Sequence, residues 1–288
     1  METLQSRVIP YLELMRLNRP IGILLLLWPT LSALWIAAEG KPDLTVFIVF
    51  TLGVIIMRSA GCVINDYADK DVDGLVARTL NRPLITGAVQ PKYALMLFAG
   101  LGLVAFLLVL LLNSLTFWMS FVGLFLAATY PYMKRYTYLP QVYLGAAFGW
   151  AIPMAFAAQT GAVPIIAWLL FLANVLWATA YDTFYAMADR KDDLLAGVKS
   201  TAILFGEDDK VIIGALQFSF LFVMLLVGSQ LEMSLSYYVG ILVAAGLSVY
   251  QQKITKKKEA AQCMHAFLNN NWVGAALFIG IVIHYAVI

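Results

Sequence analysis

A stripe of polar side chains at the end of an apolar segment, residues 46–64, holds the first group of residues that could do chemistry. The group comprises Asn65, Asp66, Asp69 and Asp73. On a helix of about 100° per residue, the three aspartates lie within an arc of about 60° and so face one way. Arg58 lies two turns, about 10 Å, earlier on nearly the same face, where a charge is costly in lipid unless it has a partner or a function.

A second stripe follows another apolar segment, residues 165–181. Its members are Asp182, Asp189 and Asp193. On a helix they lie within an arc of about 40° and again share one face. Either stripe alone would be explained by a water-exposed helix end with incidental acids. Two such stripes on one side of a membrane predict a shared polar pocket.

A pocket with this many carboxylates would repel itself strongly without bound cations. Carboxylate and amide oxygens without histidine or cysteine are typical ligands of a hard ion. Mg²⁺ binds one or two carboxylates together with the phosphate oxygens of a substrate. The sequence therefore predicts a Mg²⁺ site that also holds a phosphate-containing substrate.

Basic side chains lie near both stripes and supply the other kind of partner that phosphate needs. They are Arg78, Arg82, Lys134, Arg135, Arg190 and Lys199. Lys134 and Arg135 belong to a short basic and aromatic cluster, which fits an anchor at the inner leaflet equally well. Acids for Mg²⁺ beside bases for phosphate oxygens fit a bound diphosphate.

The elements that position these residues are transmembrane helices. The chain of 288 residues is 62% hydrophobic and 12% charged, with a mean hydropathy of +0.82, so it is far more apolar than a soluble domain. Its apolar runs predict an all-α integral membrane protein with nine transmembrane helices. The runs are residues 21–38, 46–64, 93–112, 114–131, 141–159, 165–181, 211–230, 235–250 and 272–288.

Positive charge falls on one side of these predicted helices. Of the 19 Lys and Arg residues, only Lys41 lies in the opposite loops and only Arg58 lies within a span. Because positively charged loops stay in the cytoplasm, we expect a cytoplasmic N-terminus and an outside C-terminus. We expect one domain over residues 1–288, with long cytoplasmic loops at about 67–92 and 182–210 that cap the site.

Charge and motifs exclude several classes of function. The net charge of +2 is one-sided rather than strong, so it concerns the inner leaflet and anionic substrates, and we expect no nucleic acid partner. No Gly-x-x-x-x-Gly-Lys-Ser/Thr loop is present, which argues against an ATP-driven pump. A diphosphate in a membrane pocket indicates a lipid diphosphate. If the lipid is allylic, Mg²⁺ can neutralise the leaving group while a dry aromatic cavity protects the carbocation.

The two motifs resemble those of the UbiA-type intramembrane prenyltransferases, and the resemblance covers nearly the whole chain. The motifs read Asn65-Asp66-x-x-Asp69-x-x-x-Asp73 and Asp189-x-x-x-Asp193. Alone they would mark only the superfamily. Longer strings are most similar to the members that prenylate 4-hydroxybenzoate, namely RPIGILLLLWPTLSALW, NRPLITGAV, YPYMKRYTYLPQVYLGAAFGWAIPMAFAA, YDTFYAMADRKDD and GVKSTAILFG.

The resemblance implies a nine-helix bundle around a central cavity and assigns roles within it. The residues implied to hold Mg²⁺ and the prenyl diphosphate are Asn65, Asp66, Asp69, Asp73, Asp189 and Asp193. Those implied to contact diphosphate oxygens are Lys199 and Arg78 or Arg82, and we add Lys134 as a candidate. Arg58 would face the aromatic acceptor, and its depth independently suits pairing with a carboxylate. Asp182 either joins the catalytic aspartates or orients the acceptor or a basic side chain.

The implied reaction is electrophilic aromatic substitution in ubiquinone biosynthesis. Polyprenyl diphosphate loses diphosphate, and the allylic cation is attacked by the ring carbon of 4-hydroxybenzoate ortho to the hydroxyl and meta to the carboxylate. An aspartate of the second stripe or the released diphosphate removes the ring proton. The resemblance also implies a multi-pass protein of the bacterial cell inner membrane with its site on the cytoplasmic side.

Other functions remain possible on the sequence. One is prenyl transfer to another aromatic or quinone-precursor acceptor. Another is a cation-coupled secondary transporter, which predicts inverted repeats and broken mid-membrane helices, whereas the acids here lie at one face beside long loops. A third is a non-catalytic subunit that binds a quinone or isoprenoid, for which so many carboxylates would be excessive.

Overall fold

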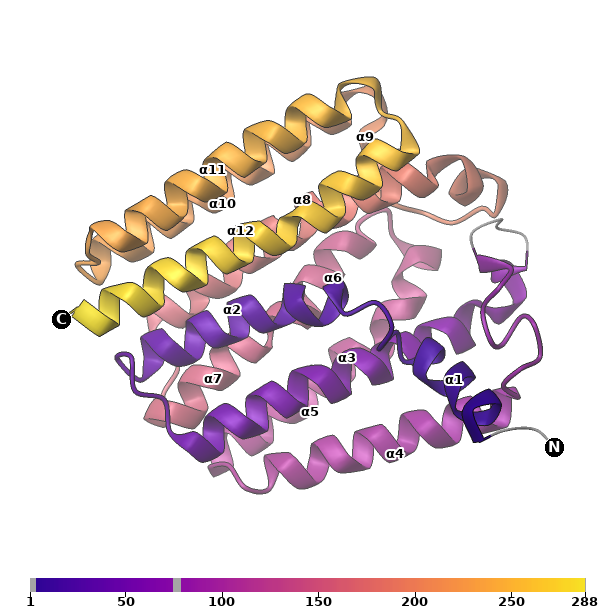
Figure 1. The fold of residues 1–288 in the computed structure, drawn as a ribbon, viewed down its shortest axis with the longest axis horizontal. Helices are drawn as coiled ribbons and strands as arrows, with labels where there is room; N and C mark the ends of the chain where they lie inside the picture. The colour runs from indigo at the N-terminus through magenta and orange to yellow at the C-terminus, as the bar shows by residue number, and fades with distance from the viewer. Residues whose placement is uncertain (1–3, 75–78, 288) are drawn as a thin grey trace.

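The computed structural model describes residues 4–74 and 79–287, and this part of the chain is helical and without strands (Figure 1). Arg78 lies outside the described residues, as does the side chain of Asp73. The helices are α1 Leu4–Leu14, α2 Ile21–Ala37, α3 Leu44–Asp73, α4 Pro91–Val109, α5 Ser114–Tyr136, α6 Pro140–Gly149, α7 Ala151–Thr160, α8 Ile165–Leu195, α9 Thr201–Phe205, α10 Asp209–Gln230, α11 Leu235–Ile254 and α12 Ala260–Val287, with short 3₁₀ turns η2 Gly206–Asp208 and η3 Thr255–Lys257.

Seven helical segments of the described chain are long and apolar enough to cross a membrane. They are Leu44–Asp71, Pro91–Val109, Ser114–Tyr136, Pro140–Thr160, Ile165–Leu195, Thr201–Gln230 and Ala260–Val287. Helix α2 is apolar but shorter, with 17 residues. The protein is therefore an all-α, multi-pass membrane protein, as the composition predicts.

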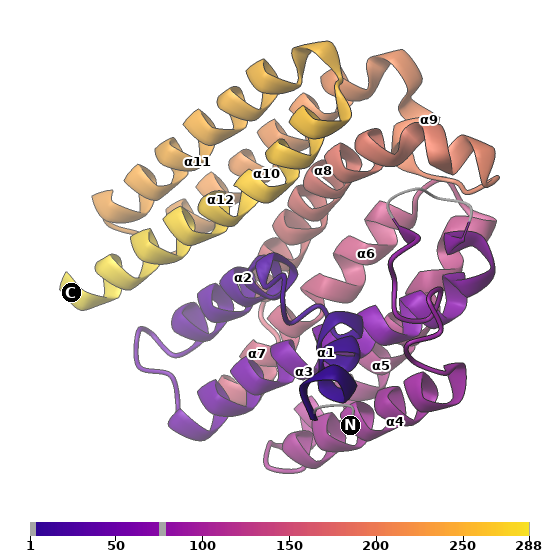
Figure 2. The same ribbon diagram turned by 45° about the vertical axis from the view of Figure 1, so that its right-hand side comes forward.

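The helices form two groups that pack side by side (Figures 1 and 2). Helices α2 to α7 form one group and α8 to α12 the other, and they meet where α12 packs on α2 and where α6 packs on α8. Helices α4 and α5 bury few residues against the rest of the chain, with Ala94 the buried residue of α4. Many of their apolar side chains are exposed, among them Met96, Leu103, Trp118 and Phe125, as expected of helices that contact lipid.

Each aspartate stripe extends one long helix. Helix α3 has 30 residues and continues through Asp73, and α8 has 31 residues and continues through Leu195. The expectation of a cap loop over residues 182–210 is thus wrong for most of that range, because residues 182–195 contain no glycine or proline and polarity alone does not end a helix. The helix ends just before Gly197, which adopts φ +68°.

The segment between α5 and α8 is broken into α6 and α7 at Trp150. Pro153 explains the break, because its ring collides with the carbonyl of residue 149 and it has no amide hydrogen to donate. Upstream of the break, a Cβ atom on Gly145 would lie 3.0 Å from the backbone of Val175. The small residue therefore permits the close packing of α6 on α8.

Candidate active site

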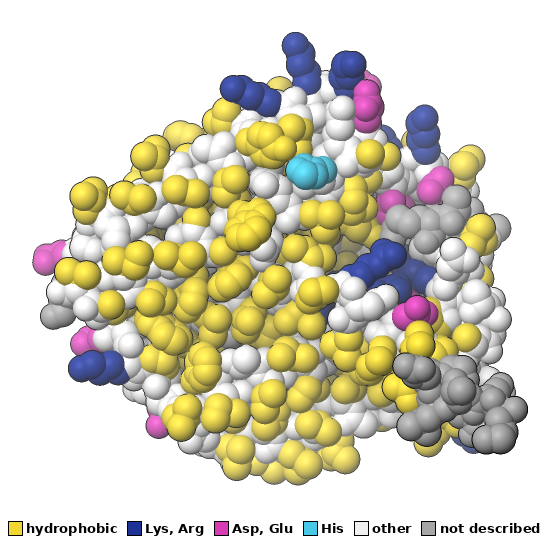
Figure 3. Space-filling model, viewed as in Figure 1, with side chains coloured by type: hydrophobic (Ala, Val, Ile, Leu, Met, Phe, Trp, Pro, Cys, Tyr) yellow, Lys and Arg dark blue, Asp and Glu magenta, His cyan; other side chains and the backbone are white. Residues whose placement is uncertain are grey.

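A large cavity opens beside the polar end of α3. Its volume is about 1110 Å³, and its lining includes residues of helices α2 to α8 and α12 together with the segment that follows α1. Most of the lining is apolar, and its polar side chains include Arg16, Arg58, Asn65, Asp66, Arg82 and Asp182. Figure 3 shows basic side chains gathered at this end of an otherwise hydrophobic face.

A smaller recess of about 160 Å³ brings the two aspartate stripes together, because it is lined from both α3 and α8. Its acidic and basic lining residues are Asp69, Arg82, Lys134, Asp182, Asp189, Asp193 and Lys199. The recess adjoins the large cavity, because five side chains line both spaces, namely Asn65, Arg82, Tyr130, Asp182 and Tyr185. The predicted shared pocket between the two stripes is thus present in the structure.

Asp66 is held by two guanidinium groups from different parts of the chain. Its side chain is only 2% exposed, and Arg16 donates to its two oxygens at 3.0 and 2.9 Å. Arg82 contacts Oδ1 at 3.0 Å from the loop between α3 and α4. The two cations stabilise a buried carboxylate that would otherwise be costly to keep ionised.

Asp69 lies one turn further along α3 and is also 2% exposed. Lys134, at the end of α5, pairs with its Oδ2 atom, whereas Oδ1 is buried without a hydrogen-bond partner. A buried carboxylate oxygen without a partner is rare in proteins, so Oδ1 is available to bind a ligand. Lys134 is thus part of the recess, which decides against the interpretation of this lysine as an anchor at the membrane surface alone.

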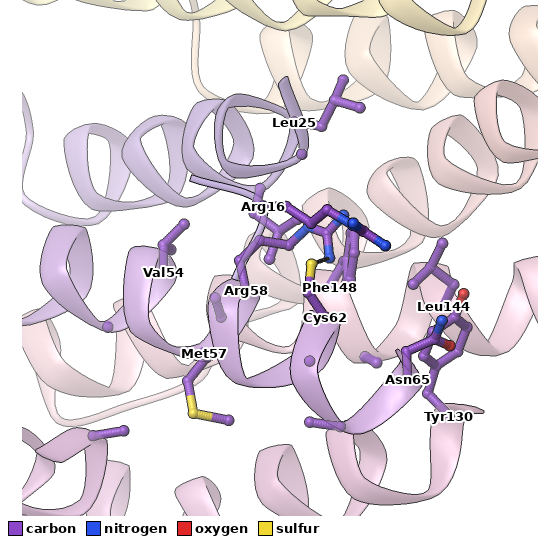
Figure 4. A pocket seen from close by; sticks show the side chains of 18 of the residues that line it. Arg16, Leu25, Val54, Met57, Arg58, Cys62, Asn65, Tyr130, Leu144 and Phe148 are labelled. Atoms are coloured by element: carbon purple, nitrogen blue, oxygen red, sulfur yellow. Dashed lines mark hydrogen bonds between the residues drawn. The ribbon is translucent and has the colours of Figure 1, made fainter. Parts of the chain in front are cut away.

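Arg58 lies deeper, on the wall of the large cavity (Figure 4). Its Nη1 donates to Sγ of Cys62 at 2.6 Å, and its guanidinium lies 5.8 Å from the centre of the Phe148 ring. Its Nε is buried without a hydrogen-bond partner. The structure therefore holds a cation with unused donor capacity two turns below the carboxylates, as the spacing in the sequence predicts.

Four of the other predicted residues line the recess, whereas Arg190 lies outside it. Asp182, Asp189 and Asp193 line the recess on the α8 side. Lys199 lines it too, donates to the carbonyl of Tyr136 at 3.3 Å and lies 5.4 Å from the ring centre of Tyr138. Arg190 forms an ion pair with Asp209 at the start of α10, so it fixes the end of α8.

Some residues of the site were missed by the sequence reasoning. Arg16 is the clearest case, because it lies 50 positions from Asp66 and follows α1 in a left-handed conformation with φ +57°. Three tyrosines that line the cavity were also missed as site residues, namely Tyr130, Tyr181 and Tyr185. The sequence places Tyr181 and Tyr185 beside Asp182 on α8, which was the available signal for them. Tyr130 and Asn65, both labelled in Figure 4, line the large cavity and the recess.

The acids suit a metal that is completed by its substrate. Among the described residues, no three carboxylate, imidazole or thiol side chains converge to form a ready metal site. Mg²⁺ does not need such a cage, because it binds one or two carboxylates together with water and phosphate oxygens. Asp69, with its unpartnered oxygen, and the acids across the recess fit that mode of binding.

Comparison with known proteins decides the family. The model of the UbiA prenyltransferase family matches residues 26–280. The chain belongs to the UbiA prenyltransferase family. The match confirms the resemblance to this family that the motifs on α3 and α8 carry.

The chain is similar to relatives that are named for one specific enzyme activity. It is 61% identical to the 4-hydroxybenzoate octaprenyltransferase of Nitrosococcus oceani, over 98% of this chain and 99% of the relative. It is 60% identical to the protein of the same name from Alcanivorax borkumensis, over 96% and 95% of the two chains.

Solved structures have the same fold. A UbiA homologue from Aeropyrum pernix matches with a TM-score of 0.80 at 25% identity, over 91% of this chain and 97% of that one. A UbiA homologue from Archaeoglobus fulgidus bound to GPP and Mg²⁺ matches with a TM-score of 0.76 at 18% identity, over 97% of this chain and 100% of that one.

Proposed function

We propose that this chain transfers a polyprenyl group from polyprenyl diphosphate to 4-hydroxybenzoate, at the carbon ortho to the hydroxyl, and releases diphosphate as a step of ubiquinone biosynthesis. The observation that carries this proposal is the cation Arg58, with its partnerless Nε, on the wall of an apolar cavity that ends in two groups of aspartates. A buried guanidinium suits an acceptor that bears a carboxylate. The names of the relatives support the same activity.

Mg²⁺ and the diphosphate belong between α3 and α8, in the recess and where it adjoins the large cavity. The residues that would hold Mg²⁺ are Asn65, Asp66, Asp69, Asp73, Asp189 and Asp193. Bound Mg²⁺ neutralises charge on a diphosphate leaving group. Lys134, Lys199 and Arg82, together with Arg78 outside the described residues, would contact diphosphate oxygens. The homologue bound to GPP and Mg²⁺ supports this use of the fold.

The residues of the large cavity handle the acceptor and the carbocation. Arg58 binds the acceptor carboxylate and so orients the ring toward the recess. Tyr130, Tyr181 and Tyr185 line the large cavity. Their rings exclude water and stabilise a cation through their electron-rich faces. Asp182 is the carboxylate shared by both spaces, so it is the candidate to accept the ring proton as the new carbon–carbon bond completes.

The proposal includes a topology for the protein. A single domain of nine transmembrane helices surrounds the cavity in the bacterial inner membrane, with the N-terminus and the site on the cytoplasmic side and the C-terminus outside. The distribution of Lys and Arg supports this orientation. The family match over residues 26–280 supports a single domain.

Purified protein in lipid nanodiscs, supplied with octaprenyl diphosphate, 4-hydroxybenzoate and Mg²⁺, tests the proposal. We expect one product by mass spectrometry, the acid with one octaprenyl group, together with one equivalent of diphosphate. A product formed equally fast after chelation of divalent ions would contradict the metal site. Prenylation of another aromatic compound but not of 4-hydroxybenzoate would contradict the acceptor.

A further inference from the structure

The guanidinium of Arg58 rests against the backbone of α2 at Gly22. A Cβ atom on this glycine would lie 2.6 Å from both Nε and Nη2 of Arg58 and 2.9 Å from Cζ. Carbon and nitrogen atoms that are not bonded do not approach so closely, because the van der Waals minimum lies near 3.5 Å. The observed position of the guanidinium is therefore compatible only with glycine at position 22.

The closest neighbour of this glycine is a side chain rather than the backbone of another helix. The three atoms nearest to a Cβ at Gly22 all belong to the Arg58 guanidinium, the far end of a flexible side chain. At Gly240 and Gly280, by contrast, a Cβ would meet backbone atoms of a neighbouring helix at 2.8 Å. A methyl group at position 22 would therefore meet the guanidinium first and displace it, because the end of a flexible side chain moves more easily than a helix backbone.

Other contacts fix the guanidinium from different directions. Cys62 accepts from Nη1, and the ring of Phe148 lies beside the guanidinium, as Figure 4 shows for these side chains. Gly22 is itself buried and lines the large cavity. Gly22, Cys62 and Phe148 come from α2, α3 and α6, so the cation is located where three helices meet.

We propose that Gly22 is a positioning residue for the acceptor: by lacking a side chain, it sets where the Arg58 guanidinium lies and thereby which carboxylate-bearing ring can bind. This inference rests on the proposed function, in which Arg58 binds the acceptor carboxylate. Paired hydrogen bonds from a guanidinium to a carboxylate depend strongly on direction, so a shifted guanidinium binds the acid poorly even though its charge remains.

Steady-state kinetics of Gly22→Ala, with both substrates varied, tests the inference. We expect the KM for 4-hydroxybenzoate to rise about tenfold, the loss typical of one charge-assisted hydrogen bond, while the KM for the prenyl diphosphate stays unchanged. The unfolding temperature should be equal or higher, because alanine favours helix over glycine. Gly100→Ala on α4 is the matched control, since a Cβ there meets no atom within 4 Å and the position does not line the cavity.

A double-mutant cycle separates this inference from the proposed function. Arg58→Ala should itself raise the KM for the acid, and adding Gly22→Ala should then change nothing, because the side chain that the glycine positions is gone. If Arg58→Ala raises the KM but Gly22→Ala behaves like Gly100→Ala, Gly22 has no positioning role and the proposed function stands. If the KM for the acid is insensitive to Arg58→Ala, the acceptor site is wrong and the inference falls with it.

An acceptor without the carboxylate gives a second readout. Its transfer rate should be low in the parent protein and should not fall further in Gly22→Ala, because no group remains for Arg58 to bind. 4-Hydroxybenzyl alcohol is a suitable probe, since it keeps the phenol and replaces the carboxylate with a neutral group. An equal loss with both acceptors would show that the alanine damages the site generally and would overturn the positioning role.

Discussion

Arg16 donates to both carboxylate oxygens of Asp66, at 3.0 and 2.9 Å, and so ties the segment after α1 to the first aspartate of the α3 stripe. Arg82 contacts the same carboxylate from the following loop. The ionised aspartate is therefore compensated in the protein without substrate. Asp66 lines the large cavity, and its neighbour in the chain, Asn65, lines both the cavity and the recess.

Asp66→Asn should lower kcat for prenyl transfer at least about a hundredfold, because an amide keeps the shape but loses the charge that attracts Mg²⁺. The measurement is the rate of prenylated product under saturating substrates. Asp71→Asn is the matched control, since Asp71 is exposed on the same helix and lines neither space. Equal losses in both variants would contradict a specific role for Asp66.

Removal of metal should stop turnover, and Mg²⁺ should restore it. The unpartnered Oδ1 of Asp69 leads to a sharper expectation. Asp69→Asn should raise the Mg²⁺ concentration needed for half-maximal rate by about tenfold or more. A Mg²⁺ titration of the parent and variant measures this, and an unchanged midpoint would exclude Asp69 as a ligand.

A pair of glycines on α4 tests where the prenyl chain lies. Gly102 lines the large cavity and Gly100 does not, and a Cβ on either would meet no atom within 4 Å. Gly102→Leu should fill part of the cavity and lower kcat/KM for long donors relative to short ones by about tenfold. Competition between donors of different lengths measures the ratio. Gly100→Leu should leave it unchanged, and similar ratios in both variants would place the chain elsewhere.

The end of α8 is held by a buried acid outside the site. Asp209 is 0% exposed and pairs with Arg190 and, at 3.0 Å, with Lys258. Burial alone would lower the pKa of Lys258, but its hydrogen bonds to Asp209 and Glu207 raise it. Asp209→Asn should lower the free energy of unfolding by about 2 kcal/mol, because it weakens the charge-assisted hydrogen bonds of a buried acid to Arg190 and Lys258, although Lys258 keeps Glu207 as a partner.

Unfolding by denaturant in detergent micelles measures the effect of Asp209→Asn. Asp208→Asn is the control, because the neighbouring side chain is exposed. A difference of less than about 0.5 kcal/mol between the two variants, the usual size of a surface effect, would show that the buried pair contributes little.

Local periodicity explains what the sequence could predict. The stripes on α3 and α8 follow from helical spacing, and the depth of Arg58 follows from its distance to Asn65 along the same helix. Contacts between distant segments could not be predicted, because no local pattern encodes them. Two such contacts are the ion pair of Arg16 with Asp66 and the position of the Arg58 guanidinium against Gly22. Both depend on how α1 and α2 pack on α3. The extension of α8 through residues 182–195 was not predicted, because the polar residues of this segment were interpreted as a loop.

The length of α3 has a consequence for how reactants and products travel. Thirty residues of helix span about 45 Å, whereas the hydrocarbon layer of a bilayer is about 30 Å thick. The charged end of the helix therefore reaches the membrane–water interface, while its apolar part stays in the hydrocarbon layer. A water-soluble acid and the released diphosphate can exchange with the aqueous phase, and the prenylated product remains dissolved in the membrane, where a later membrane-bound step would find it by diffusion in two dimensions.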